Sequence, residues 1–378
     1  MIKNKETTFT VIDLFCGVGG FSLGAARAGF NVAHAIDNDP IVIETHKKNF
    51  LSTKHNSINL SDVTGKQLLK MLGITTGEIT GIIGGPPCQG FSTIGKNHAE
   101  DKRNDLFIKF YQIVRDIKPK FFVGENVPGL LREKHNPARL RANKILNKDY
   151  DLFPPIIINA GDYGVPTSRT RVFFVGFRKS AERKIALIDI LPEKINIKTT
   201  VSQALKGLPI KIKHDGPSYE NGLRKVKYLS NGSFTSRLRE IIPNVGNPLV
   251  IKNLLKNNLV TGCQGTLHSD AVLKRWEELA QGETDKVSRA MRLDPKGLCP
   301  TLRAGTGKEH GGFQSLRPIH PTENRVITPR EAARLQGFPD WFLFHSTKWH
   351  SFRQIGNSVS PIVAELLLTK IIGTLKNT

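Results

Sequence analysis

Short apolar runs rich in β-branched and aromatic residues alternate with stretches of helical character between Thr8 and Gly176. A helix is expected over Phe21–Ala28, because its periodic apolar positions stop at Gly29. Strands are expected at Phe9–Leu14, Asn31–Ile36, Gly81–Gly84, Lys120–Glu125, Pro155–Asn159 and Arg171–Phe177. This alternation is typical of an α/β protein with a mainly parallel, doubly wound sheet and helices on both faces.

From about Ala181 the pattern dissolves into short pieces with many Gly, Asn and Pro residues. The chain has 378 residues, which exceeds the roughly 250–300 that one hydrophobic core usually serves. We therefore expect two lobes, of which the second is irregular.

The run from Asp13 to Gly24 joins the first strand to the first helix through a glycine-rich turn. Glycines let the backbone approach a ligand closely, and a helix N-terminus offers free N–H groups. The second strand is followed by Asp37, and an acid at this place typically binds a ribose. The spacing predicts a nucleoside cofactor. The turn has no Gly-Lys-Ser/Thr ending, which disfavours a P-loop nucleotide hydrolase.

Cys88 directly follows a Pro-Pro step at the end of a predicted buried strand, in the run Gly84–Ser92. Proline restrains the backbone, and Gly and Ser residues downstream predict a loop. This setting suits a nucleophile that meets a substrate and is then covered. A buried structural cysteine is the alternative on this residue alone.

In family order, the motifs of the chain resemble those of the DNA (cytosine-5)-methyltransferases. The resemblance covers nearly the whole chain and rests on Asp13–Gly24, Asp37, Ser61–Val63, Pro86–Gln89, Arg103–Phe107, Glu125–Val127, Arg169–Arg171, Arg325–Pro339 and Gln354–Val359. Two positions depart from the family pattern: Asn38 replaces an aromatic residue and Thr167 a glutamine.

The resemblance implies a Rossmann-like methyltransferase sheet and S-adenosylmethionine as cofactor. It implies a catalytic domain of residues 1–180 and 351–378, onto which the helix Pro361–Leu375 returns, and a smaller target-recognition domain of residues 181–350. The catalytic residues would be Cys88, Glu125, Arg169 and Arg171. The cofactor-binding residues would be Asp13, Phe15, Gly17, Gly19, Gly20, Asp37, Asp62, Pro86, Leu106, Asn357 and Ser358.

The chemistry of these residues is coherent without the family. C5 of cytosine is a poor nucleophile, and attack of the Cys88 thiolate on C6 would make C5 enamine-like. Glu125 ends an apolar strand, where burial favours the neutral carboxyl that can donate a proton to N3. Arg171 can bind the exocyclic oxygen of the base.

Purely structural roles are the alternatives for several of these side chains. Asp62 would be the N-cap of a helix over Val63–Leu72, and Asn126 would cap a turn before Pro128. Asn357 and Ser358 would form an ordinary turn. Glu125 would sit in a surface ion pair, and one of the two arginines would be solvated or bind phosphate.

The chain carries 55 Lys and Arg against 33 Asp and Glu, a net charge of +22. This excess favours a polyanionic partner, and no apolar run approaches the length of a membrane span. Basic residues concentrate between Leu223 and Val260, and the polar stretch Ser92–Arg103 would close over an extruded base. We expect DNA contacts from Ser92, Lys96, Arg103, Arg224, Lys225, Lys227, Arg237 and Arg239. Lys252 and Lys256 belong to the same basic segment.

The four cysteines have no Cys-x-x-Cys pairing, so neither a metal site nor a disulfide scaffold is expected. The start of the chain lacks the apolar core of a signal peptide, and we expect a cytoplasmic, nucleoid-associated monomer.

The sequence thus predicts an enzyme that flips a cytosine out of double-stranded DNA, within a specific sequence, and methylates its C5. The compact size favours a restriction–modification system, with a cognate endonuclease as partner. A cytosine-5 methyltransferase acting on transfer RNA and a catalytically silent DNA-binding relative remain as alternatives.

Overall fold

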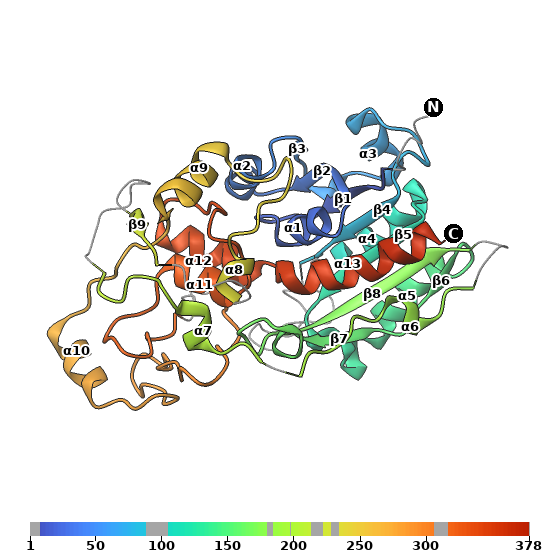
Figure 1. Ribbon diagram of the computed structural model, residues 1–378. Coiled ribbons are helices and arrows are strands. Elements are labelled where there is room, and N and C mark those ends of the chain that lie inside the picture. Colours follow the sequence, from blue (N-terminus) through green and yellow to red (C-terminus); the bar gives the residue numbers. More distant parts are fainter. Residues whose placement is uncertain are drawn as a thin grey trace.

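The first part of the chain forms one eight-stranded sheet in the computed structural model (Figure 1). The structure describes residues 8–87, 105–179, 184–196, 198–212, 222–227, 234–305 and 317–377. The strands are β1 (Thr10–Leu14), β2 (Asn31–Asp37), β3 (Lys54–Ser57), β4 (Gly81–Gly84), β5 (Phe121–Asn126), β6 (Tyr150–Leu152), β7 (Ile156–Asn159) and β8 (Thr170–Arg178). They lie in the order β3-β2-β1-β4-β5-β8-β6, and β7 also pairs with β8.

The first five strands of this order are parallel, and β8 pairs antiparallel with β5, β6 and β7. The predicted mainly parallel α/β fold is confirmed, and the six predicted strands end within one residue of the observed ones. The sequence did not reveal β3 or β6. β3 is a polar edge strand, Lys-His-Asn-Ser, and β6 has three residues, so neither contains an apolar run.

Helices cover both faces of the sheet because each buries an apolar side on it. They are α1 (Gly20–Arg27), α2 (Pro40–Asn49), α3 (Gly65–Leu72), α4 (Asp105–Ile117), α5 (Asn136–Leu146) and α13 (Pro361–Lys376). One apolar cluster joins the sheet to α1 and α13, and another joins it to α3, α4 and α5. A Cβ on Gly24 of α1 would lie 2.3 Å from the Cβ of Ala364, so glycine allows the last helix to pack directly on the first.

The remaining part of the chain consists of short elements, as expected, and most of them lie at the left of Figure 1, whereas α6 lies at the right, beside the sheet region. Its helices are α6 (Leu187–Ile190), α7 (Val201–Leu205), α8 (Phe234–Arg237), α9 (Pro248–Asn257), α10 (Asp270–Glu277), α11 (Pro329–Leu335) and α12 (Lys348–Asn357). β9 (Arg224–Lys225) and β10 (Leu259–Val260) form a small antiparallel pair. The predicted domain boundary at residues 350 and 351 falls inside α12.

This irregular part shares a core with the sheet region. Val18, Leu23 and Phe50 belong to the same buried cluster as Trp341 and Phe342. The side chain of Asn49, at the end of α2, exchanges two hydrogen bonds of 2.9 Å with the backbone of Leu343. The edge of the sheet region and the segment before α12 are therefore held at a fixed distance.

Lys348–Lys376 is long and apolar enough to cross a membrane by composition, but 67% of its most apolar window is buried. Within it, α12 ends at Asn357 and α13 starts at Pro361. We assign this stretch to the protein core.

Candidate active site

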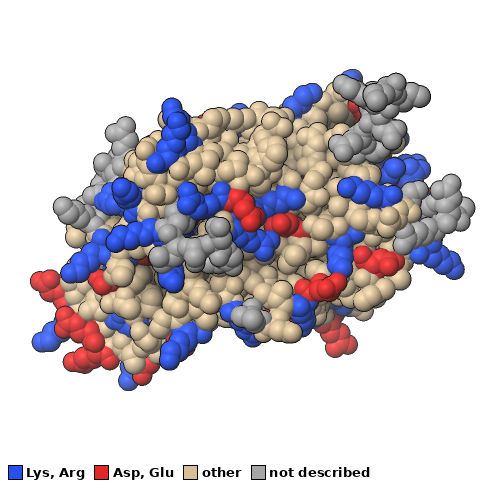
Figure 2. Space-filling model, in the orientation of Figure 1, with Lys and Arg blue, Asp and Glu red and all other residues tan. Residues whose placement is uncertain are grey.

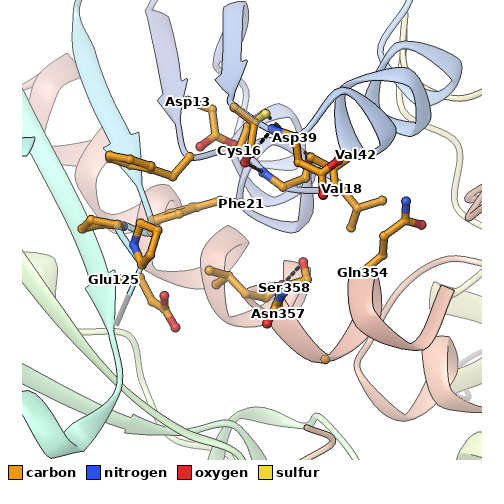
Figure 3. Close-up of a pocket in the computed structure, with 18 of the residues that line it drawn as sticks. Asp13, Cys16, Val18, Phe21, Asp39, Val42, Glu125, Gln354, Asn357 and Ser358 are labelled. Atoms are coloured by element: carbon orange, nitrogen blue, oxygen red, sulfur yellow. Dashed lines mark hydrogen bonds between the residues drawn. The ribbon is translucent and has the colours of Figure 1, made fainter. Parts of the chain in front are cut away.

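A cavity of about 440 Å³ opens where the carboxyl ends of β1, β2, β4 and β5 face the end of α12 (Figure 3). Parallel sheets of this kind bind ligands at these strand ends, and the volume suits a small molecule. Glu125 lies at one end of the cavity, and Asp39 and Val42 lie at the other (Figure 3). The predicted site residues that line it are Asp13, Phe15, Gly17, Asp37, Pro86, Leu106, Glu125, Arg169, Arg171, Asn357 and Ser358.

Other predicted site residues do not line this cavity. Cys88, Ser92, Lys96 and Arg103 lie outside the described residues. Gly19 caps α1, and Gly20 is its first residue. A Cβ on Gly20 would lie 2.0 Å from Oγ of Ser358, so only glycine lets α1 begin this close to the segment that follows α12.

Asp62 is exposed on the short 3₁₀ turn Leu60–Asp62 and is not among the residues lining the cavity. Its carboxylate accepts hydrogen bonds from Asn59 (2.9 Å) and Ser61 (2.7 Å). The alternative that Asp62 caps the following helix is wrong, because the side chain of Thr64 caps α3 in a capping box with Gln67.

Asp37 holds the turns on both sides of it. Its Oδ2 accepts the backbone N–H of Gly17 and its Oδ1 that of Asp39, each at 3.0 Å. Burial raises the pKa of this carboxyl, and the backbone donors counteract the rise. A carboxylate oxygen has a second lone pair, so Asp37 can order the glycine turn and still accept from a ligand hydroxyl.

Asp13 is fully buried at the end of β1 and contributes to the cavity wall. Its Oδ2 accepts a 2.6 Å hydrogen bond from the Ser22 hydroxyl, and its Oδ1 has no hydrogen-bond partner within the described residues. Burial raises the pKa of Asp13 to about 7, although the Ser22 hydroxyl opposes the rise. An unpaired buried carboxylate oxygen beside a cavity points to a ligand with a positive charge or a donor.

Glu125 and Arg171 form an ion pair inside the cavity, with Nε 2.8 Å from Oε1. The antiparallel pairing of β5 with β8 brings the two strands together, with Glu125 opposite Phe173. Glu125 is only 8% exposed, so its ion pair is not the surface pair of the alternative interpretation. The pair presents an acid and a guanidinium side by side, as recognition of a polar ring edge requires.

Arg169 lies two residues earlier and is 2% exposed. Its guanidinium donates to the carbonyl oxygen of Leu302 at 3.3 Å, which links it to the irregular part of the chain. The two arginines therefore both reach the cavity, but they differ in their protein contacts.

Asn126, next to Glu125, has two separate bonds. Its Oδ1 accepts the N–H of Val127 at 2.9 Å, which is the structural alternative that Asn126 caps a turn. Its Nδ2 donates to the carbonyl oxygen of Pro86 at 3.2 Å. This second bond ties the end of β5 to the segment that leads to Cys88.

The sequence interpretation gave no site role to His350, Arg353 or Gln354 of α12, which also line the cavity. Nη1 of Arg353 lies 3.6 Å from the Asp39 carboxylate, and Gln354 donates to the hydroxyl of Thr45 at 2.9 Å. They precede Asn357 by seven, four and three positions, so helical spacing from that residue would have found them.

The predicted DNA contacts that the structure describes, Arg224, Lys225, Lys227, Arg237 and Arg239, are not among the residues that line this cavity. Lys225, Lys227, Lys252 and Lys256 are exposed. Arg237 instead pairs with Glu365 of α13 at 2.7 Å, so its charge is engaged within the protein. In Figure 2 basic side chains spread over the visible face; one group of acidic side chains lies at the end that Figure 1 assigns to α10, and others lie at the centre and at the lower right.

The described residues contain no group of three or more His, Cys, Asp or Glu side chains placed to hold a metal ion. Cys16, Cys263 and Cys299 are buried and free.

Residues 9–373 match the family model described as C-5 cytosine-specific DNA methylase. The Type II methyltransferase M.XorII of Xanthomonas oryzae pv. oryzae is 40% identical over 97% of this chain and 85% of its own length. M.DdeI of Desulfomicrobium norvegicum is 33% identical over 96% of this chain and 88% of its own length. A crystal structure described as that of a DNA modification methyltransferase encoded within an E. coli prophage has a TM-score of 0.87. It is 48% identical, over 98% of this chain and all of that chain.

Proposed function

The chain belongs to the C-5 cytosine-specific DNA methylases and is a DNA (cytosine-5)-methyltransferase of the Type II restriction–modification kind, and from this premise we propose a specific reaction. It transfers the methyl group of S-adenosylmethionine to C5 of a cytosine that has been flipped out of duplex DNA, within one recognition sequence. The observation that carries this proposal is the ion pair of the buried Glu125 with Arg171, which shares one cavity with the Gly17–Asp37 turn.

The cavity residues fit the cofactor. Asp37 offers carboxylate oxygens beside the glycine turn for a ribose, and Asp13 offers an unpaired buried oxygen for a positive group. Phe15 and Leu106 supply apolar wall, and Asn357 and Ser358 supply polar groups from the end of α12. When bound, S-adenosylmethionine supplies an electrophilic methyl group.

The base side of the cavity fits a cytosine. In our proposal Arg171 binds the exocyclic oxygen, and Glu125 donates a proton to N3 while the Cys88 thiolate attacks C6. The attack forms the sulfur–C6 bond and makes C5 nucleophilic. After methylation, loss of the C5 proton to solvent restores the double bond and expels the thiolate, and N3 returns its proton to Glu125.

A base within a duplex cannot reach an ion pair that lies inside a cavity, so it must leave the stack. The exposed lysines of the irregular part would hold phosphates, and unidentified side chains of residues 181–350 would read the sequence. We expect a monomer acting on nucleoid DNA in the cytoplasm, together with an endonuclease that cuts the same site when it is unmethylated.

Methyl transfer to transfer RNA is the second candidate. The similarity to named Type II methyltransferases over nearly the whole chain favours DNA. The experiment incubates the purified protein and S-adenosylmethionine with duplex DNA and, separately, with transfer RNA. Bisulfite sequencing of the DNA is expected to show one cytosine in one sequence context. Modification of the RNA alone, or of neither substrate, would overturn the proposal.

A further inference from the structure

Four polar side chains form a hydrogen-bonded chain from the cavity to the edge of the sheet. The Ser22 hydroxyl lies 2.6 Å from Oδ2 of Asp13, and Nε2 of His46 lies 3.1 Å from that hydroxyl. Nδ1 of His46 lies 2.8 Å from Nε2 of His55 on β3. Asp13, Ser22 and His46 have no exposed surface, whereas His55 is half-buried.

The chemistry of these groups fixes the direction of the hydrogen bonds when Asp13 is ionised. A carboxylate only accepts, so Ser22 donates to it and its oxygen is left to accept from His46. His46 then carries its proton on Nε2, and its Nδ1 accepts from His55. Burial lowers the pKa of both imidazoles, that of His55 to about 4, so both are neutral in this arrangement. Every donor points toward Asp13.

The other ionisable groups around these four side chains do not take over the stabilisation of the Asp13 carboxylate. Asp37 on β2 and the buried Cys16 thiol lie on the cavity side, and a negative charge on either opposes ionisation of Asp13. At the far end, Lys47 and Glu44 of α2 act on His55 with opposite signs. The ring of His46 packs on Phe50, with centroids 4.2 Å apart. Ser22 is thus the hydrogen-bond donor to the Asp13 carboxylate within the described residues.

We propose that Ser22, His46 and His55 are positioning residues that keep Asp13 ionised, so that its free oxygen neutralises the positive charge of the bound cofactor. This rests on the proposed function, because it assigns a role to residues around its cofactor site. The positive charge belongs to the ammonium or to the sulfonium of S-adenosylmethionine.

The proposal fixes the sign of a pH effect. Protonation of Asp13 removes the countercharge, so cofactor affinity falls as the pH drops through the pKa of Asp13. The Ser22 hydroxyl stabilises the anion, and its removal raises that pKa. In the Ser22→Ala protein the loss of affinity should therefore begin at a higher pH.

The test is calorimetry of S-adenosylmethionine binding between about pH 5.5 and 9, with wild type, Ser22→Ala and Thr374→Ala. Thr374 also carries a buried hydroxyl, but it donates to Lys370 within α13, away from the cavity. We expect the pH midpoint to rise by about one unit in Ser22→Ala, which is the usual size of a hydrogen bond to a charged group. It should not move in Thr374→Ala.

Two further ligands identify the charge. S-adenosylhomocysteine keeps the ammonium but lacks the sulfonium, and 5′-deoxy-5′-methylthioadenosine lacks both. If the affinity for S-adenosylhomocysteine keeps the same pH dependence, the charge that Asp13 neutralises is the ammonium. If that pH dependence is lost, the charge is the sulfonium. Binding of the second ligand with the same pH dependence would overturn the proposal, because no cofactor charge would then be involved.

His46→Phe provides a second variant, since it keeps a ring against Phe50 and removes both nitrogens. A smaller shift in the same direction is expected, and circular dichroism would show which variants are folded. Folded variants with the wild-type pH midpoint would overturn the positioning role of Ser22 and His46 and leave the proposed function intact. A wild-type protein that binds no S-adenosylmethionine at any pH would instead overturn the proposed function.

Discussion

The side-chain amide of Asn126 donates a hydrogen bond to the carbonyl oxygen of Pro86, across the gap between the ends of β5 and β4. Asn126 follows Glu125 directly, and Pro86 stands two residues before Cys88. One bond therefore couples the proposed acid to the segment that carries the proposed nucleophile. The position of Glu125 relative to Pro86 is therefore set by this hydrogen bond as well as by the backbones of β4 and β5.

Asn126→Ala should lower the methylation rate by about 10-fold, because loss of one buried hydrogen bond costs roughly 1–1.4 kcal/mol and loosens the Pro86 segment. Cofactor affinity should hardly change. Single-turnover methylation and calorimetry measure the two quantities. Asn159→Ala is the control, since Asn159 also ends a strand and caps a turn but lies outside the cavity. Equal rates for the two variants would contradict the coupling.

Glu125→Gln should reduce turnover by about 10²–10⁴, the usual contribution of a general acid, with little change in DNA affinity. Glutamine keeps the shape of the side chain beside Arg171, but it cannot supply the proton to N3. Steady-state kinetics and a DNA-binding titration give the two values. The exposed Glu133→Gln controls for the loss of one negative charge. If affinity falls and turnover does not, Glu125 serves binding rather than catalysis.

Cys88→Ala should abolish methylation and leave S-adenosylmethionine binding in place. DNA containing 5-fluorocytosine blocks the last elimination, so the wild-type protein should form a covalent adduct that survives denaturation. The variant should form none. Cys263→Ala, which removes a buried thiol far from Cys88 in the sequence, should trap the DNA normally. Near-normal methylation by Cys88→Ala would refute the covalent mechanism.

The parts of this site that the sequence predicted are those encoded by neighbouring residues. The glycine turn, Asp37 and the Glu125 strand end follow from apolar runs that stop at polar residues, and the fold places them at one edge. The Glu125–Arg171 pair was not predictable in this way. It depends on the antiparallel register of β5 and β8, which is set by the packing of the whole sheet.

Contacts between distant segments were also not predictable. His46 of α2 contacts Ser22 of α1, and although Ser22 lies in the expected Asp13–Gly24 run, His46 belongs to no expected motif. Arg237 shows that the sequence also did not reveal an ion pair within the protein. Its place in a basic segment predicted phosphate contact, but the fold brings it to Glu365 of α13. Charge counts along a sequence do not show which charges are already paired.

Asp37→Ala should weaken S-adenosylmethionine binding by removing a ribose acceptor and the support of Gly17. Asp37→Asn separates these effects, because one amide oxygen remains to accept a hydrogen bond while the charge is lost. Calorimetry should show a smaller loss for Asn than for Ala, and DNA binding should change little. Unchanged cofactor affinity in Asp37→Ala would refute the assignment. Asp39, which lines the same cavity beside Arg353, would then be the next candidate.

Neutralising the exposed basic residues of the irregular part should weaken DNA binding and flatten its salt dependence. Each lost phosphate contact should reduce the slope of log affinity against log salt by about 0.9 on duplex DNA. The variants are Lys225→Ala, Lys227→Ala, Lys252→Ala and Lys256→Ala, alone and combined.

Lys274→Ala is the matched control for these variants. Lys274 is also exposed, but it lies on α10, near the exposed acids Asp270, Glu277 and Glu278 that would repel a phosphate backbone. Its loss should leave the slope unchanged. Arg237→Ala should lower stability rather than the slope, because it breaks the pair with Glu365. Because the cofactor cavity is built from the strand ends and α12, the combined lysine variant should still bind S-adenosylmethionine with wild-type affinity. If its salt slope equals that of wild type, the DNA lies on another face of the protein.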